Sequence, residues 1–314
     1  YRLSLVRGTF PVNVYETTGR YLENLQELAM SERPAESEAT FERNLLVGID
    51  LEKEMSLNTE VTPFGPSAPL KTFKASALSA DQRIESAYYD TDLRTADAVL
   101  ELYRHNVPVS NIHRVLSVGM LGQKKRRKIV PTRWSISATD EIISSRLVKT
   151  NDTNPSIDLF EVTWYSHLAN YYYVILIPYD VWSFEMIESW FTNNGQIVTE
   201  TDYEDANGID HYPNIAGAYF AARLAVAEHL AEKRQKAAAL VLREIHPEYV
   251  MPLGVWQIRE AIREALKKSP EKFETLDAAL TFATASLSMS KQEIFEKSRL
   301  WQTFSSQTRI TDFA

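Results

Sequence analysis

The stretch that decides the fold is residues 156–178, which read SIDLFEVTWYSHLANYYYVILIP. In its first half Phe160, Val162 and Trp164 recur at every second position, which is the period of a β-strand. Its second half, Tyr171–Ile177, is apolar throughout, as in a strand that is buried on both faces. A short turn at Ser166–Asn170 separates the halves. The sequence therefore predicts a β-hairpin at about 157–178.

Helical periodicity flanks this hairpin on both sides. Upstream, the pattern predicts helices around Tyr21–Met30 and within residues 81–122, and a further helix that Ser137 or Thr139 caps. Downstream, a helix rich in small residues is expected from Gly217 to about Ile245. More helices are expected over residues 253–268 and on to about Leu300. Residues 31–60 are acidic and predicted to be irregular.

The expected fold is mixed α+β, with helical segments around a small β-sheet core and a helical C-terminal half. We expect an N-terminal part at 1–150 and a C-terminal part at 151–300, or one continuous domain over both. Residues 301–314 are rich in Gln, Ser and Thr after Trp301, which is typical of a flexible tether.

Composition limits the class of protein. With 314 residues, 44% of them hydrophobic, the chain can bury a sizeable core. It has no cysteine, which excludes disulfides and thiolate zinc sites and fits a cytoplasmic location. No apolar run is long enough to cross a bilayer. The net charge of −8 argues against a coat of nucleic acid but leaves room for a local basic patch.

Such a patch is predicted where five consecutive bases precede a tryptophan. Lysine and arginine neutralise phosphates, and an indole ring offers a face on which a base can stack. The alternative is a solvated loop followed by a buried tryptophan. The candidate residues for binding a nucleotide or nucleic acid here are Lys124, Lys125, Arg126, Arg127, Lys128, Thr132, Arg133, Trp134 and Ser135.

Two arginines on largely apolar helices, Arg223 and Arg259, are further candidates for binding phosphate. An arginine in such a setting must find an anion. The anion is either a phosphate or an internal carboxylate, such as Glu228, Glu244 or Glu260.

An acidic segment at residues 199–215 has the composition of a loop. Its carboxylates and imidazole are suited to Mg²⁺ or Mn²⁺, and the alternative is a hydrated loop without a metal. The candidate ligands are Asp202, Asp205, Asp210 and His211, beside Glu204. Asp140 and Glu141 are a second acidic pair that could hold such an ion. No Walker A loop, GxSxG, GxGxxG or HExxH is present, so spacing alone assigns no enzyme class.

The last eight residues, 307–314, place Gln307, Ile310 and Phe313 three residues apart. In a single helical turn Ile310 and Phe313 fall on the same side. This spacing resembles the peptide box that docks on the replication sliding clamp, where a second aromatic normally stands in the place of Ala314. That substitution should weaken docking. The alternative is that Phe313 folds back onto its own domain.

Several long blocks together are similar to one family. They are residues 64–71 (FGPSAPLK), 130–136 (VPTRWSI), 182–186 (WSFEM), 217–224 (GAYFAARL) and 252–260 (PLGVWQIRE). The chain resembles the archaeal Nre family of DNA repair proteins, which end in a box that binds the PCNA clamp. Members usually begin with a cysteine-rich, zinc-finger-like segment, and no zinc site carries over to this cysteine-free chain.

The resemblance implies a cytoplasmic DNA repair protein that PCNA recruits through its C-terminal motif, with DNA or a nucleotide as a further partner and no membrane. Two alternatives stay open. One is an enzyme with metal-dependent phosphodiester or nucleotide chemistry, and the other is a non-catalytic repair adaptor.

Overall fold

The computed structural model of the protein describes residues 7–33, 35–42, 56–58, 61–64, 67–76, 79–192, 194–249 and 253–306. The predicted clamp-docking residues Gln307, Ile310, Phe313 and Ala314 lie outside these ranges. The chain divides into two compact units. Unit 1 is Tyr1–Ile143 with Met251–Gly254, and unit 2 is Ser144–Val250 with Val255–Ala314.

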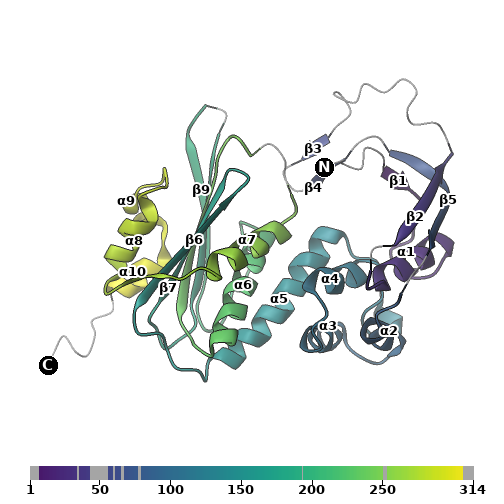
Figure 1. The fold of residues 1–314 in the computed structure, drawn as a ribbon, viewed down its shortest axis with the longest axis horizontal. Helices are drawn as coiled ribbons and strands as arrows, with labels where there is room; N and C mark the ends of the chain where they lie inside the picture. The colour runs from purple at the N-terminus through teal and green to yellow at the C-terminus, as the bar shows by residue number, and fades with distance from the viewer. Residues whose placement is uncertain are drawn as a thin grey trace. The chain divides into compact units, whose positions relative to one another are not determined.

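Unit 2 is built on a six-stranded sheet (Figure 1). In spatial order its strands are β11 (Glu271–Phe273), β6 (Phe160–His167), β7 (Asn170–Ile177), β10 (Ala238–Ile245), β8 (Phe184–Phe191) and β9 (Ile197–Glu204). All neighbours are antiparallel except β10 and β8, which run parallel. The predicted hairpin is therefore confirmed as β6 and β7, which pair from Glu161 with Leu176 to His167 with Asn170.

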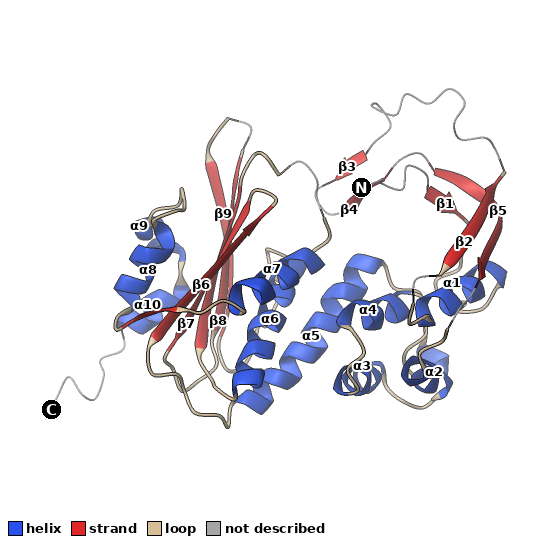
Figure 2. Ribbon diagram, in the orientation of Figure 1, coloured by secondary structure: helices blue, strands red, loops and turns tan. Residues whose placement is uncertain are grey.

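Helices cover both faces of this sheet (Figure 2). On one face lie α6 (Gly217–Lys233) and α7 (Trp256–Leu266), and on the other α8 (Leu276–Thr284), α9 (Lys291–Lys297) and α10 (Arg299–Ser306). Strand β7 contributes side chains to the hydrophobic cores on both faces of the sheet. Tyr172, Val174 and Leu176 belong to the core that includes α6 and α7. Tyr173, Ile175 and Ile177 belong to the core on the other face. Burial on both faces explains why this strand is continuously apolar.

The hairpin turn itself is strained. Leu168 and Ala169 both have positive φ, at 50° and 56°. A two-residue hairpin loop of this kind favours Asn-Gly, because asparagine and glycine adopt positive φ more readily than leucine or alanine. The pairing of β6 with β7 holds these two residues in that conformation.

The helix predicted from Gly217 to Ile245 is wrong after Lys233. Helix α6 ends at Lys233, and Arg234 adopts the left-handed conformation at φ 52°. The chain then returns as β10, which is buried at the centre of the sheet between β7 and β8. The C-terminal half is therefore less helical than expected, and β11 adds a further short strand to it.

The loop expected at residues 199–215 is also corrected. Its first six residues belong to β9, which pairs along its whole length with β8. Polar residues occupy this strand because internal partners satisfy them, as described below. Loop structure begins only after Glu204.

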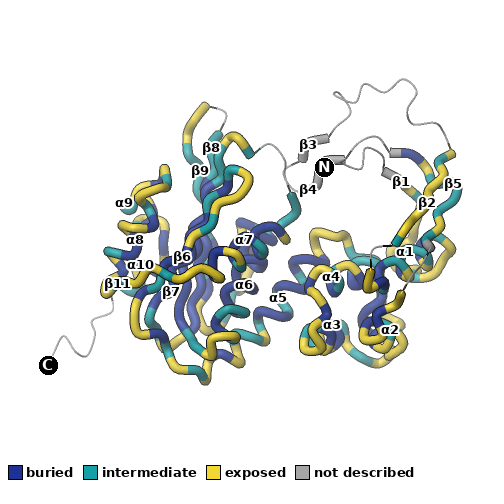
Figure 3. Tube along the Cα trace, viewed as in Figure 1, coloured by how far each residue is buried: buried dark blue, intermediate teal, exposed yellow. Residues whose placement is uncertain are grey.

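Unit 1 combines helices with a small three-stranded sheet. Strand β5 (Ser67–Ser76) lies between β1 (Arg7–Thr9) and β2 (Glu36–Phe41), and β3 (Ser56–Asn58) pairs separately with β4 (Val61–Phe64). The strand β2 corrects the irregular structure predicted for residues 31–60. Figure 3 shows that β2 is exposed along most of its length.

The helices of unit 1 pack on one another, and α1 joins them to this sheet. They are α1 (Arg20–Met30), α2 (Gln82–Tyr89), α3 (Thr95–Arg104), α4 (Val109–Ser117) and the 3₁₀ turn η1 (Lys124–Arg126). Helix α1 is tied to β5 because the Tyr21 hydroxyl donates to the carbonyl of Lys71 and the Asn24 amide donates to that of Phe73. The mixed α+β class predicted from the sequence is confirmed.

Helix α5 (Thr132–Asn151) begins earlier than predicted, at Thr132 and not after Ser137 or Thr139. The amides of Trp134 and Ser135 both donate to the carbonyl of Pro131, so the proline starts the helix. Within the described part of the chain, no helix is long and apolar enough to cross a membrane.

Candidate nucleic-acid interface and acidic-loop pocket

The run of five bases in unit 1 divides into two kinds of residue. Lys124, Lys125 and Arg126 form η1 and are exposed, as is Lys128 after them. Arg127 is only 9% exposed. The amide of Lys124 donates to the carbonyl of Thr91, which ties η1 to the segment that links α2 to α3. The structure thus leaves a fixed turn of cationic side chains at the surface.

Arg127 is used inside the fold. Its guanidinium donates to the carbonyls of Gly122 at 2.7 Å, Tyr88 at 2.7 Å and Asp90 at 3.0 Å. It also lies over the ring of Tyr88, 5.1 Å from the centroid. Burial lowers the pKa of Arg127, and the neighbouring Tyr88 and Asp90 oppose this shift. The charge therefore holds together the carbonyls of Gly122, Tyr88 and Asp90 within the fold.

Gly122 is required for that arrangement. Its φ is +101°, and a Cβ added there would lie 2.3 Å from the Thr95 hydroxyl oxygen. A side chain would therefore displace the carbonyl to which Arg127 is bonded.

The first turn of α5 supplies the aromatic part of the predicted patch. Trp134 is 61% exposed, and Thr132 and Arg133 are exposed beside it. Ser135 is buried, and its hydroxyl donates to the carbonyl of Thr132. Of the predicted patch, the exposed members are Lys124, Lys125, Arg126, Lys128, Thr132, Arg133 and Trp134, and we call them the basic surface.

In unit 2, Arg223 is buried on α6 and lies in an internal network. Its Nε donates to Glu204 at 2.6 Å, and its Nη1 donates to the hydroxyls of Ser144 and Ser145. The indole of Trp182 donates to the same Glu204 oxygen at 2.5 Å. Each of these two buried charges compensates the other, so removing either one would leave an unpaired charge between α6 and β9.

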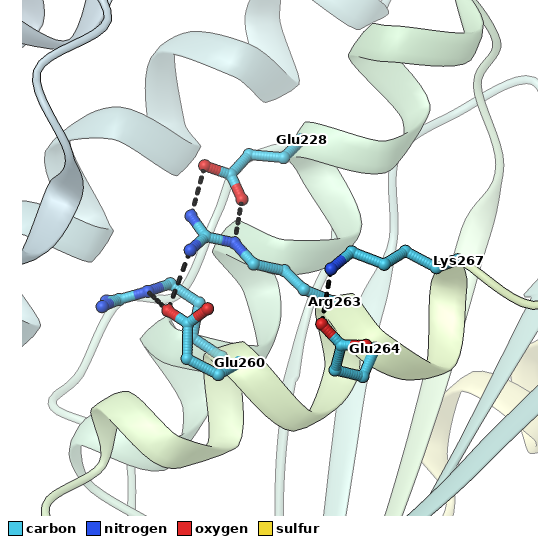
Figure 4. Close-up of polar contacts among 6 residues, drawn as sticks. Glu228, Glu260, Arg263, Glu264 and Lys267 are labelled. Atoms are coloured by element: carbon cyan, nitrogen blue, oxygen red, sulfur yellow. Dashed lines mark hydrogen bonds and ion pairs between the residues drawn. The ribbon is translucent and has the colours of Figure 1, made fainter.

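Arg259 on α7 is also buried, at 1% exposure, and its Nε lies 3.3 Å from Glu260. One turn further along α7, Arg263 forms a two-pronged pair with Glu228 of α6, with both distances at 2.8 Å (Figure 4). Arg263 also bonds Glu260 at 2.9 Å. The predicted internal carboxylates Glu228 and Glu260 are therefore the partners seen on this helix pair.

The acidic segment forms the end of β9 and the loop that follows it. Asp202 is buried, and its carboxylate accepts the backbone amides of Asn214 and Ile215 at 3.0 and 2.8 Å. Asp205 accepts the amide of Asn207. Among the described residues no group of three or more carboxylates and imidazoles is arranged to hold a metal ion. The Mg²⁺ or Mn²⁺ site suggested by composition stays a prediction.

His211 closes this loop onto the strand. Its Nδ1 lies 2.8 Å from exposed Asp210, and its Nε2 lies 3.5 Å from buried Asp202. Hydrogen bonding to Asp210, and then to Asp202, raises the pKa of His211 above its ordinary value. A pocket of about 280 Å³ opens here, lined by Tyr203–Asp205, Asn207–His211 and Arg299.

The predicted site residues thus fall into two groups on different units. The bases and Trp134 belong to unit 1, whereas Arg223, Arg259 and the acidic loop belong to unit 2. The sequence did not predict that Glu204 pairs with Arg223, or that the indole of Trp182 donates to the same Glu204 oxygen. The one usable signal was the two-residue spacing of Asp202 and Glu204, which is typical of one face of a strand.

Comparison with known proteins shows matches to one family along nearly the whole chain. The family model for the N-terminal part of archaeal Nre matches residues 1–194, and the model for the C-terminal part matches residues 204–313. The first match ends after β8 and the second begins at Glu204, the last residue of β9, so the interval between them lies inside one continuous sheet. The two matches therefore do not correspond to two separately folded bodies. No solved structure is significantly similar to this one.

Three curated relatives are similar over most of their length. DNA repair protein NreB of Archaeoglobus fulgidus is 34% identical over 306 residues, which covers 96% of this chain and 75% of the relative. DNA repair protein NreA of the same organism is 34% identical over 290 residues, covering 90% and 72%. DNA repair protein NreA of Haloferax volcanii is 34% identical over 321 residues, covering 98% and 74%. The chain belongs to the archaeal Nre family.

Proposed function

We propose that this protein acts in DNA repair, contacts DNA through the basic surface of unit 1, and is recruited by the PCNA clamp through its last eight residues. The repair role is supported by three relatives that are named DNA repair proteins and cover most of the chain. The DNA contact is supported by the exposure of Lys124, Lys125 and Arg126, and by the exposed ring of Trp134 on the same unit.

The net negative charge of the chain favours a DNA contact that is confined to a local basic surface. The chain as a whole carries a formal charge of −8, so its net charge repels DNA. Binding must therefore depend on the few places where cations gather. Exposed lysines and arginines on a fixed turn lose little conformational freedom of the backbone when they meet phosphates.

The DNA contact is tested with a triple variant, K124A/K125A/R126A, and a labelled oligonucleotide in fluorescence anisotropy at low salt. The matched control is K267A/K272A/K297A, which removes the same charge from exposed lysines of unit 2. We expect the first variant to bind at least tenfold more weakly than the control. Equal affinities would overturn the assignment of the basic surface.

The clamp contact is tested separately by deleting residues 307–314. Titration calorimetry with PCNA should show binding by the full chain and none by the deletion variant, while circular dichroism and DNA affinity stay unchanged. Ala314→Phe should tighten clamp binding, because it restores the second aromatic of the docking box. Unchanged affinity after the deletion would overturn the proposed role of Gln307, Ile310 and Phe313.

A further inference from the structure

An exposed turn at Asn13–Glu16 adjoins the basic surface. Tyr15 at its tip is 77% exposed, the highest value among the exposed large apolar residues of the described chain, and Val12 and Val14 are 45% exposed. A tyrosine ring in this position leaves most of its apolar area in water. Exposed aromatic area next to cations is typical of surfaces on which nucleic-acid bases stack.

Three local hydrogen bonds link the residues of this turn. The carboxamide oxygen of Asn13 accepts the amide of Tyr15 at 3.1 Å, and its nitrogen donates to the Glu16 carboxylate at 3.1 Å. The amide of Glu16 in turn donates to the carbonyl of Asn13 at 3.0 Å. These bonds favour one conformation of the backbone under Tyr15, which lowers the entropic cost of binding.

Backbone contacts fix the turn to the end of the basic run. The amide of Ile129, the residue after Lys128, donates to the carbonyl of Val14 at 2.9 Å. Behind it, Gly119 has φ +72°, and a Cβ there would lie 2.8 Å from Thr17 and 3.1 Å from the carbonyl carbon of Lys128. Close packing at Gly119 thus joins the turn and the basic run into one piece of surface.

We propose that Tyr15 is a stacking platform for an unpaired base, so that the basic surface prefers DNA with single-stranded character over intact duplex. This inference rests on the proposed DNA contact and names its substrate class. In a duplex the faces of the bases are covered by their neighbours, and a protruding ring gains nothing from them. In single-stranded DNA, the cations bind the backbone while Tyr15 offers its face to an unpaired base.

The experiment compares Tyr15→Ala, Tyr15→Phe and the control Tyr212→Ala, which removes a 66% exposed tyrosine from unit 2. Affinity is measured by anisotropy for an oligo-dT strand and for a duplex of equal length. Tyr15→Ala should weaken binding to the single strand by about tenfold and to the duplex by less than about twofold, because one base stack contributes on that scale. Tyr15→Phe and Tyr212→Ala should match the wild type.

A second readout needs no variant. Photo-crosslinking of the wild-type protein to a strand containing 5-iododeoxyuridine, followed by mass spectrometry, should place an adduct on Tyr15. Loss of binding in K124A/K125A/R126A without an effect of Tyr15→Ala, and without that adduct, would overturn the stacking role alone. If the triple variant also bound normally, the proposed DNA contact itself would fail.

Discussion

Replacing Arg127 with alanine should destabilise unit 1 by about 3 kcal/mol. One hydrogen bond donated by a charged group contributes about 1.5–3 kcal/mol. Arg127 donates three, to the carbonyls of Gly122, Tyr88 and Asp90, but they share a single guanidinium and their contributions are not additive. The neighbouring variant Arg126→Ala removes an exposed side chain and should change stability by less than about 0.5 kcal/mol.

Two measurements check this difference. Urea unfolding followed by circular dichroism gives the free energy of unfolding of each variant, and hydrogen exchange with mass spectrometry locates the loss. Peptides from α2 and from residues 119–128 should exchange faster in Arg127→Ala, whereas peptides from the sheet of unit 2 should not change. A loss below about 1 kcal/mol, or equal losses in both variants, would refute the structural role given to Arg127.

Three further predictions concern unit 2. Glu204→Gln leaves the buried charge of Arg223 without its carboxylate and should lower the free energy of unfolding in urea by about 3–5 kcal/mol. Adding Arg223→Met should recover part of that free energy. Strictly additive effects of the two substitutions would refute the pairing. Ala169→Gly should raise the free energy of unfolding by about 1 kcal/mol, because positive φ is strained for alanine, and no gain would contradict the strain assigned to the turn. The pKa of His211, followed by its ring signals in NMR, should lie above 6.5 and fall in Asp210→Asn. Because the pKa of His211 is raised in the folded state, its stabilisation of the loop is complete below the pKa of the unfolded state. It is lost as pH rises through the pKa of the folded state. A His211 pKa at or below 6.5 would refute the pairing.

The sequence predicts the hairpin well, because alternation in β6 and continuous burial in β7 are both local signals. The sequence does not predict β10, because Arg234 ends α6 in a left-handed conformation without the glycine that usually marks the end of a helix. It fails at β9 because Asp202 and Glu204 look like loop residues. Their carboxylates are buried only because partners distant in the chain, Asn214 and Arg223, satisfy them.

The sequence also could not show which residues of the basic run are buried and which are exposed. In the sequence Arg127 cannot be told from Arg126, since both stand among like charges. The difference arises from carbonyls of residues 88, 90 and 122, which the fold brings to one of the two side chains and not to the other. Tyr15 is missed for a related reason, because only the tertiary bond between Val14 and Ile129 places it beside the cations.

The central claim is that a small, defined set of cations on unit 1 contacts DNA phosphates. The most direct test is the salt dependence of DNA affinity for the wild type, K124A/K125A/R126A and the control K267A/K272A/K297A. Each phosphate contact contributes about −0.9 to the slope of log K against log salt concentration on duplex DNA. We predict that the slope of K124A/K125A/R126A is shallower by about 2 to 3, while the control keeps the wild-type slope. Parallel lines for all three proteins would contradict the claim.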